Sequence, residues 1–194
     1  MNLSLQTLDG SSIQTSSYTG KILIVVFFAS WSEYSVEINQ NIFTLLQNNS
    51  LPKVVFFSVT IDPVHDIPAI LTNFINSNNL QSIALNSSQW LFARDVNEQY
   101  KNYGVGSIPD SFLVDQQSII RDQKIGLMNS AMFDQWITAV NSSNYLSSSS
   151  VINSSSYLTS SSLNTISTSN LPLIPTITVF FILFIVNRKR RTNL

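Results

Sequence analysis

The stretch Phe27-Phe28-Ala29-Ser30-Trp31-Ser32-Glu33-Tyr34-Ser35 joins an apolar run to a helical pattern. The run that leads into it, residues 22–28, is continuously apolar and rich in β-branched side chains, which predicts a strand buried on both faces. Residues 36–47 place apolar side chains at helical spacing. In α/β proteins, the turn from a strand into a helix is the usual place of chemistry. We therefore expect the fold and its site to be organised around this turn.

The rest of the first 140 residues predicts alternating strands and helices. Residues 3–20 indicate a hairpin, because apolar and polar residues alternate around the turn signal Asp9-Gly10. Asp66 is expected to cap the helix that starts there, with Pro68 in its first turn. The order predicts an α/β domain with a central mixed sheet, helices on both faces and an antiparallel hairpin at one edge. The further strands are predicted over 53–61, 82–85, 108–114 and 118–125, and the helices over 66–77, 90–103 and 131–140.

Charge and cysteine content exclude several classes of function. All 11 acidic residues of the chain lie before residue 135, whereas a cluster of four basic residues lies at 188–191. An acidic domain argues against nucleic-acid binding, which needs a basic surface. The chain contains no cysteine. This excludes disulfides, thiolate metal sites and thiol catalysis by its own residues.

The composition changes abruptly after residue 140. Residues 141–170 are dominated by Ser, Asn and Thr, and such a segment cannot bury enough apolar surface to fold, so we expect a flexible stalk. Residues 171–187 are apolar and uncharged, slightly short for the roughly 17–25 residues of a membrane span. Residues 188–194 follow, and because the first four of them are basic they predict a cytoplasmic tail. We therefore expect a single-pass membrane protein whose domain, residues 1–140, lies outside the cytoplasm.

Two further features concern targeting. The N-terminus lacks the basic region and apolar run of a secretory signal peptide. The polar spacer, apolar segment and basic end also resemble the C-terminal sorting signals of prokaryotic surface proteins, in which the segment is removed after anchoring. The sequence leaves both alternatives open. Asn-x-Ser/Thr sites, which would matter only outside the cell, occur at Asn2, Asn48, Asn86, Asn141 and Asn153.

Several motifs occur together, in order, over residues 1–140. They are Leu8-Asp9-Gly10, Gly20-Lys21, Phe27-Phe28-Ala29-Ser30-Trp31, Asp62-Pro63, Tyr103-Gly104-Val105, Ile108-Pro109 and Phe112-Leu113-Val114-Asp115. This set resembles the thioredoxin-like superfamily, and most closely its AhpC/TSA, TlpA-type redoxin branch. The resemblance implies a three-layer thioredoxin-like fold with an N-terminal hairpin. It also implies thiol–disulfide chemistry at a Cys-x-x-Cys turn, where this chain has Ser32 and Ser35.

The serines decide what the resemblance can imply about activity. In the family, the helix N-terminus lowers the pKa of the first cysteine and makes its thiolate the nucleophile. A serine hydroxyl stays protonated at neutral pH and forms no disulfide. We therefore predict that Ser32 caps the helix. The resemblance also implies a cis-proline facing the helix start and a groove for a peptide or protein partner, lined by Trp31, Glu33, Tyr34, Ile108 and Pro109.

Three hypotheses of function follow. The first is a redox-inactive domain that binds a protein or peptide through this groove. The second is a redoxin-class thiol–disulfide oxidoreductase or antioxidant protein that depends on the thiols of a partner. The third is a hydrolase in which Ser32 is the nucleophile and His65, the only histidine, is the base, flanked by Asp62 and Asp66.

Metal binding is not expected from this sequence. Residues 59–63, followed by His65, resemble the SCO-type copper-chaperone branch. Both cysteines of that branch are missing, and His65 is not at its ligand position, where this chain has Ile108-Pro109-Asp110. Imidazole alone, without the thiolates, makes a poor copper site. We expect neither a metal nor a cofactor.

Overall fold

The computed structural model describes residues 1–142. The predicted stalk lies almost entirely outside the described residues, and the predicted membrane segment 171–187 and basic tail 188–194 lie wholly outside them. Among residues 1–142, none of the helices combines the length and the apolar character that crossing a bilayer requires.

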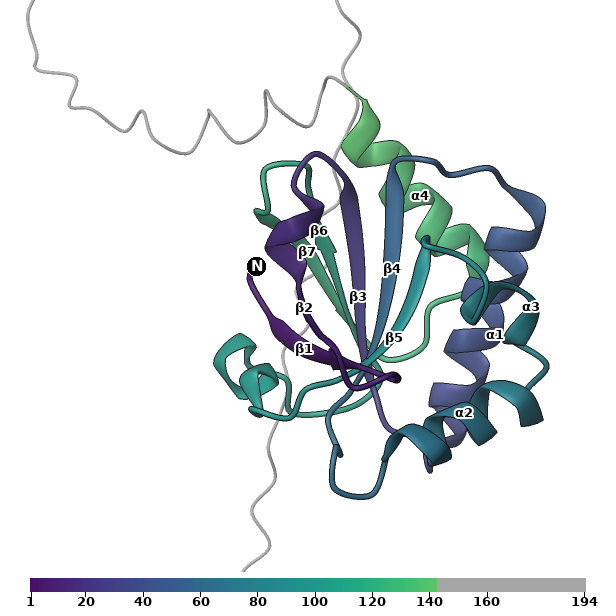
Figure 1. The fold of residues 1–194 in the computed structure, drawn as a ribbon. Coiled ribbons are helices and arrows are strands. Elements are labelled where there is room, and N and C mark those ends of the chain that lie inside the picture. The colour runs from purple at the N-terminus through teal and green to yellow at the C-terminus, as the bar shows by residue number, and fades with distance from the viewer. Residues whose placement is uncertain (143–194) are drawn as a thin grey trace, which may run out of the picture. The chain divides into compact units, whose positions relative to one another are not determined.

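One seven-stranded sheet forms the centre of the described domain, with the order β2-β1-β5-β4-β3-β6-β7 (Figure 1). Strands β3, β4 and β5 are parallel, and the hairpins at both edges are antiparallel. The strands are β1 Ser4–Thr7, β2 Ser12–Gln14, β3 Ile22–Phe28, β4 Val54–Thr60, β5 Trp90–Arg94, β6 Asp110–Val114 and β7 Ile120–Ile125. The helices are α1 Glu33–Asn48, α2 Pro68–Ser77, α3 Gln81–Ala84 and α4 Ser130–Asn141, with the 3-10 helices η1 Thr15–Tyr18 and η2 Gln99–Tyr103.

Most predicted elements are confirmed, and two are wrong. The expected short strand at 82–85 is the short helix α3. The expected helix at 90–103 is the strand β5 followed by the 3-10 helix η2. The reason is the place of β5 in the sheet, between β1 and β4, where alternate side chains must serve opposite faces. Trp90 and Phe92 accordingly enter the core on one face, while Leu91 and Ala93 pack on the other.

The two faces of the sheet are covered differently. On one face, β3 contributes Ile22, Ile24, Val26 and Phe28 to a core that also takes residues from α1, α2, α3 and α4. Figure 1 shows the four α-helices on this side. On the other face, the alternate residues of β3 pack against the N-terminal strands, η1 and η2. The prediction of helices on both faces is therefore confirmed for the first face. The second face carries only the short 3-10 helices η1 and η2, and η2 occupies part of the segment where a longer helix was expected.

A buried chain of hydrogen bonds ties α1 to the sheet. The indole Nε1 of Trp90 donates to Ser58 Oγ at 2.9 Å, and Ser58 Oγ donates to Asn39 Oδ1 at 2.6 Å. The amide Nδ2 of Asn39 then donates to the carbonyl of Ser35 at 2.7 Å. These bonds connect β5 and β4 to the first turns of α1, and they fix how the helix start sits on the sheet.

Two buried serines on either side of Val26 provide a matched test of this chain, because both pair with Val26 across neighbouring strands. Ser58→Ala leaves the Trp90 indole and the Asn39 carbonyl oxygen buried without a partner, which costs about 1–3 kcal/mol. Within residues 1–142, Ser111 Oγ is buried without a hydrogen-bond partner, so Ser111→Ala breaks no hydrogen bond and should leave stability unchanged or slightly raise it. Denaturant unfolding of the full chain measures both. Equal losses in the two variants would show that the hydrogen bonds are not what stabilises this region.

Candidate functional site

The turn between β3 and α1 sets the helix start at the predicted place. Ser32 is the N-cap residue of α1, with extended backbone angles (φ −91°, ψ 127°). Its carbonyl oxygen accepts hydrogen bonds from the amides of Ser35 at 3.0 Å and Val36 at 3.3 Å. Its side chain makes no capping hydrogen bond. The predicted capping position is therefore correct and the predicted hydroxyl cap is wrong, because the turn is closed by main-chain bonds instead.

The second serine of the turn is buried. Ser35 lies in the first turn of α1 with no exposed surface, and its hydroxyl accepts from the Ala29 amide at 3.4 Å. Ser32 is half-buried. Ser32, at the end of the helix, is thus partly accessible to solvent, whereas Ser35, in the first turn, is not.

Two aromatic side chains of this turn face solvent. Trp31 is 66% exposed and Tyr34 is 63% exposed, and Glu33 between them is also exposed. The Trp31 indole is held in place, because its Nε1 donates to Asp62 Oδ2 at 3.0 Å. The predicted groove residues of this turn are therefore accessible to a partner.

The proline-bearing segment lies beside the turn. The Ile108-Pro109 peptide bond is cis, as the family resemblance implied. Asp110, which follows it, pairs with Phe27 of β3, so Pro109 sits at the end of β3 where the turn begins. Pro109 is buried and Ile108 is half-buried. The structure brings the five predicted groove residues to one edge of the sheet, and their role in binding stays a prediction.

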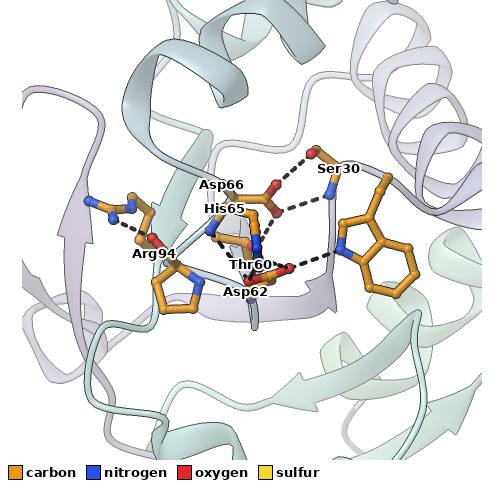
Figure 2. Close-up of polar contacts among 8 residues, drawn as sticks. Ser30, Thr60, Asp62, His65, Asp66 and Arg94 are labelled. Atoms are coloured by element: carbon orange, nitrogen blue, oxygen red, sulfur yellow. Dashed lines mark hydrogen bonds and ion pairs between the residues drawn. The ribbon is translucent and has the colours of Figure 1, made fainter.

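Asp66 has a different role from the predicted helix cap. The N-cap of α2 is Ile67, with Pro68 at the helix start as predicted. The Asp66 carboxylate is buried and accepts from the Ser30 amide at 3.0 Å, from Ser30 Oγ and from Thr60 Oγ1. Figure 2 shows the three side chains pointing toward one another. We call this set, Asp66, Ser30 and Thr60, the Asp66 clamp. It ties the loop after β4 to the turn after β3.

The exposed His65 and the half-buried Asp62 form a pair next to the clamp (Figure 2). His65 Nδ1 lies 2.8 Å from Asp62 Oδ1. Hydrogen bonding to Asp62 raises the pKa of His65, and the same bond lowers the pKa of Asp62. Among the described residues, the imidazole ring bonds to Asp62 and makes no hydrogen bond to Ser32. The structure thus assembles the His–Asp part of the hydrolase hypothesis and leaves its nucleophile unconnected.

Arg94 supports the same loop from the β5 side. Its Nη1 donates to Gln6 Oε1 at 2.7 Å, and its Nη2 donates to the carbonyl of Pro63. The loop after β4 is therefore held from two directions, by Arg94 and by the Asp66 clamp. In residues 1–142, no three His, Cys, Asp or Glu side chains gather as metal ligands would.

Asp110 is a buried acid that the sequence analysis did not single out. Its Oδ2 accepts from Gln123 Nε2 at 2.8 Å, while its Oδ1 is buried without a partner in the described part of the chain. Burial raises the pKa of Asp110, and the bond from Gln123 opposes part of that rise. The signal in the sequence was its position directly after the family's cis-proline.

The Asp66 clamp makes a prediction about stability. Asp66→Ala removes the acceptor for the Ser30 amide and for two hydroxyls, and buried donors without partners cost about 1–3 kcal/mol. Asp66→Asn keeps one carbonyl acceptor and should cost less. Asp134→Ala, at an exposed position of α4, is the matched control and should stay within about 0.5 kcal/mol of the wild type. Denaturant unfolding of the full chain reports all three, and an Asp66→Ala loss no larger than the control would refute the clamp.

Comparison with known proteins places the fold. No protein-family model matches the chain, and no curated protein sequence matches it. Several solved structures, in contrast, are similar to the chain. StoA from Bacillus subtilis is 21% identical, with a TM-score of 0.57 over 70% of this chain and 96% of its own. The exposed lipoprotein thioredoxin Etrx1 from Streptococcus pneumoniae is 20% identical, with a TM-score of 0.56 over 71% and 98% of the two chains.

A third similar structure is a thiol:disulfide interchange protein of the thioredoxin family from Chlorobium tepidum. It is 20% identical, with a TM-score of 0.57 over 72% of this chain and 92% of its own. At such identities the likeness concerns the fold and not the activity. The chain therefore has a thioredoxin-like fold, and it has serine at both positions where the redoxin resemblance places the dithiol.

Proposed function

We propose that this chain is a membrane-anchored thioredoxin-like module that binds a protein or peptide partner and performs no redox chemistry with its own residues. One observation carries the proposal. Trp31 and Tyr34 are about two-thirds exposed on a turn that is fixed on both sides. Partner binding buries such aromatic surface, and exposed aromatic side chains on a fixed frame are typical of the residues that dominate binding energy.

The rigidity of the turn supports this function. The Trp31 indole is bonded to Asp62, and the preceding Ser30 is bonded to Asp66. A surface that is already ordered loses little conformational entropy when a partner binds, which favours affinity. The half-buried Ile108 lies at the adjacent strand end, directly before the buried Pro109, so an extended segment would have both aromatic and aliphatic surface to contact.

The serines argue against catalysis by this chain. Ser32 and Ser35 stand at the helix start where the family places its cysteines, and the 194 residues contain no cysteine elsewhere. Thiol–disulfide exchange needs a thiolate that attacks a disulfide sulfur. Any such chemistry at this site would therefore use thiols that a partner supplies.

The proposed location rests on the C-terminal sequence. Residues 171–187 are apolar and are followed by Arg188-Lys189-Arg190-Arg191, a pattern typical of a membrane segment with a cytoplasmic basic flank. The similar Streptococcus pneumoniae protein is described as an exposed lipoprotein thioredoxin. That description supports a thioredoxin-like domain displayed outside the cytoplasm, with a single membrane segment as its anchor in this chain.

Photo-crosslinking in intact cells tests the proposal. A benzophenone amino acid at Tyr34 of the full chain should yield a discrete crosslinked species, because Tyr34 lies in the proposed contact surface. The same group at Ile119, which is 49% exposed in the turn at the opposite edge of the sheet, is the matched control. The species should weaken at least about tenfold when Trp31→Ala is added, since removal of an aromatic anchor costs about 2 kcal/mol or more. Crosslinking that is absent at Tyr34, or equal at both positions, would contradict the proposal.

A further inference from the structure

The exposed apolar surface of the site continues beyond the two aromatic residues. Val64 is 79% exposed, and Ile67 and Ile70 at the start of α2 are 45% and 41% exposed. All three follow β4, at the same edge of the sheet as the turn that carries Trp31 and Tyr34. We call these five residues the edge patch. A group of exposed apolar side chains at one place marks an interaction surface more often than scattered ones do.

Two hydrogen-bonded connections make the edge patch one surface. The indole of Trp31 is bonded to Asp62, two residues before Val64. The Asp66 carboxylate, directly before Ile67, is bonded to Ser30, directly before Trp31. Figure 2 shows Asp62, His65 and Asp66 gathered against the turn that carries Ser30. The loop after β4 therefore extends the surface of the turn instead of standing apart from it.

The charges around the edge patch are mostly negative. Between residues 22 and 93 the only Lys or Arg is Lys53, which precedes β4 at the opposite edge of the sheet. The same segment carries Glu33 and Glu37 exposed on α1, Asp62 in the loop, and Asp66 beneath it. The donors that Asp66 accepts from are neutral groups.

Two cationic groups lie near these acids and offset part of their charge. His65 is bonded to Asp62. Arg94 lies under the loop, where its guanidinium is bonded to Gln6 and to the Pro63 carbonyl. Both are engaged by the protein. The exposed Lys124 lies on the outermost strand β7, two strands away from β3, so within the described residues the charged groups on the turn and helix that carry Trp31 and Tyr34 are the carboxylates of Glu33 and Glu37.

We infer that the edge patch binds a cationic apolar segment of a partner protein, in which Lys or Arg side chains alternate with aliphatic ones. The inference rests on the proposed function and names the chemistry of its partner. The apolar side chains would pack on Trp31, Val64 and Ile70, and the basic ones would meet Glu33 and Glu37. Complementary charge selects this partner. The same carboxylates would repel an anionic lipid surface and a second copy of this acidic patch.

Synthetic octapeptides supply the probes. One alternates leucine with lysine, a second alternates leucine with glutamate, and a third alternates serine with lysine. Fluorescence anisotropy of each labelled peptide is titrated with the full chain in uncharged detergent micelles, against protein-free micelles as the blank. Only the leucine–lysine peptide should bind. Its affinity should fall as salt rises, because exposed charges are screened.

Variants of exposed residues locate the binding surface. Val64→Ser with Ile70→Gln should weaken binding of the leucine–lysine peptide by about tenfold or more, as should Glu33→Gln with Glu37→Gln. The matched control, Ile119→Ser with Leu85→Gln, changes similarly exposed aliphatic residues outside the patch and should leave the affinity unchanged. Circular dichroism of each variant verifies that the fold is retained.

Specific outcomes would overturn the inference. Equal binding of the lysine and glutamate peptides would show that the surface does not select a cationic partner. Equal weakening by the control variant would show that the peptide does not bind at the edge patch. Self-association that the Val64 and Ile70 changes abolish would identify a second copy as the occupant. Patch-dependent binding to phosphatidylglycerol vesicles would identify a lipid surface. If crosslinking at Tyr34 succeeds and the leucine–lysine peptide does not bind, the proposed function stands and this inference fails.

Discussion

The buried carboxylate of Asp66 is the interaction on which the site depends. Among residues 1–142 it has no cationic partner, and it is satisfied instead by the Ser30 amide and the hydroxyls of Ser30 and Thr60. A polar group in a protein interior is tolerated only when such partners are complete. Ser30 belongs to the turn after β3, Thr60 ends β4, and Asp66 lies in the loop after β4. The clamp therefore holds the turn and the loop together, and we call the two the frame of the site.

This frame explains how the site keeps its shape without sulfur. The turn is closed by main-chain bonds to the Ser32 carbonyl, and the start of α1 is fixed by the chain from Trp90 through Ser58 to Asn39. None of these bonds involves the hydroxyl of Ser32. Serine at both positions therefore leaves no thiol chemistry to these residues, and the bonds that hold Ser30 and Trp31 in place need no sulfur. The proposed recognition role relies on this order and exposure, because an ordered surface loses little conformational entropy on binding.

The sequence predicted those parts of the fold that depend on local pattern. Strand β3 was predicted with its observed bounds, because seven consecutive apolar residues have few other solutions. The segment 90–103 was mispredicted because its apolar residues also fit a helical spacing. Trp90 and Phe92 pack on one face of the sheet, and Leu91 and Ala93 on the other. This short alternation indicates a strand only when the neighbouring strands β1 and β4 are known. Asp66 was mispredicted for a similar reason. Its preference for a helix start is local, whereas its actual partners come from two other elements.

The central claim is that this turn is a redoxin turn in which serine replaces both cysteines. Disulfide formation in the full-length Ser32→Cys, Ser35→Cys variant tests it most directly, with Ser32→Cys alone as the control. The account predicts that the double variant forms an intramolecular disulfide on mild oxidation and, once reduced, reduces insulin, because the helix start lowers the pKa of the outer thiol. The single variant should do neither. A double variant whose two thiols remain free under oxidation would contradict the claim.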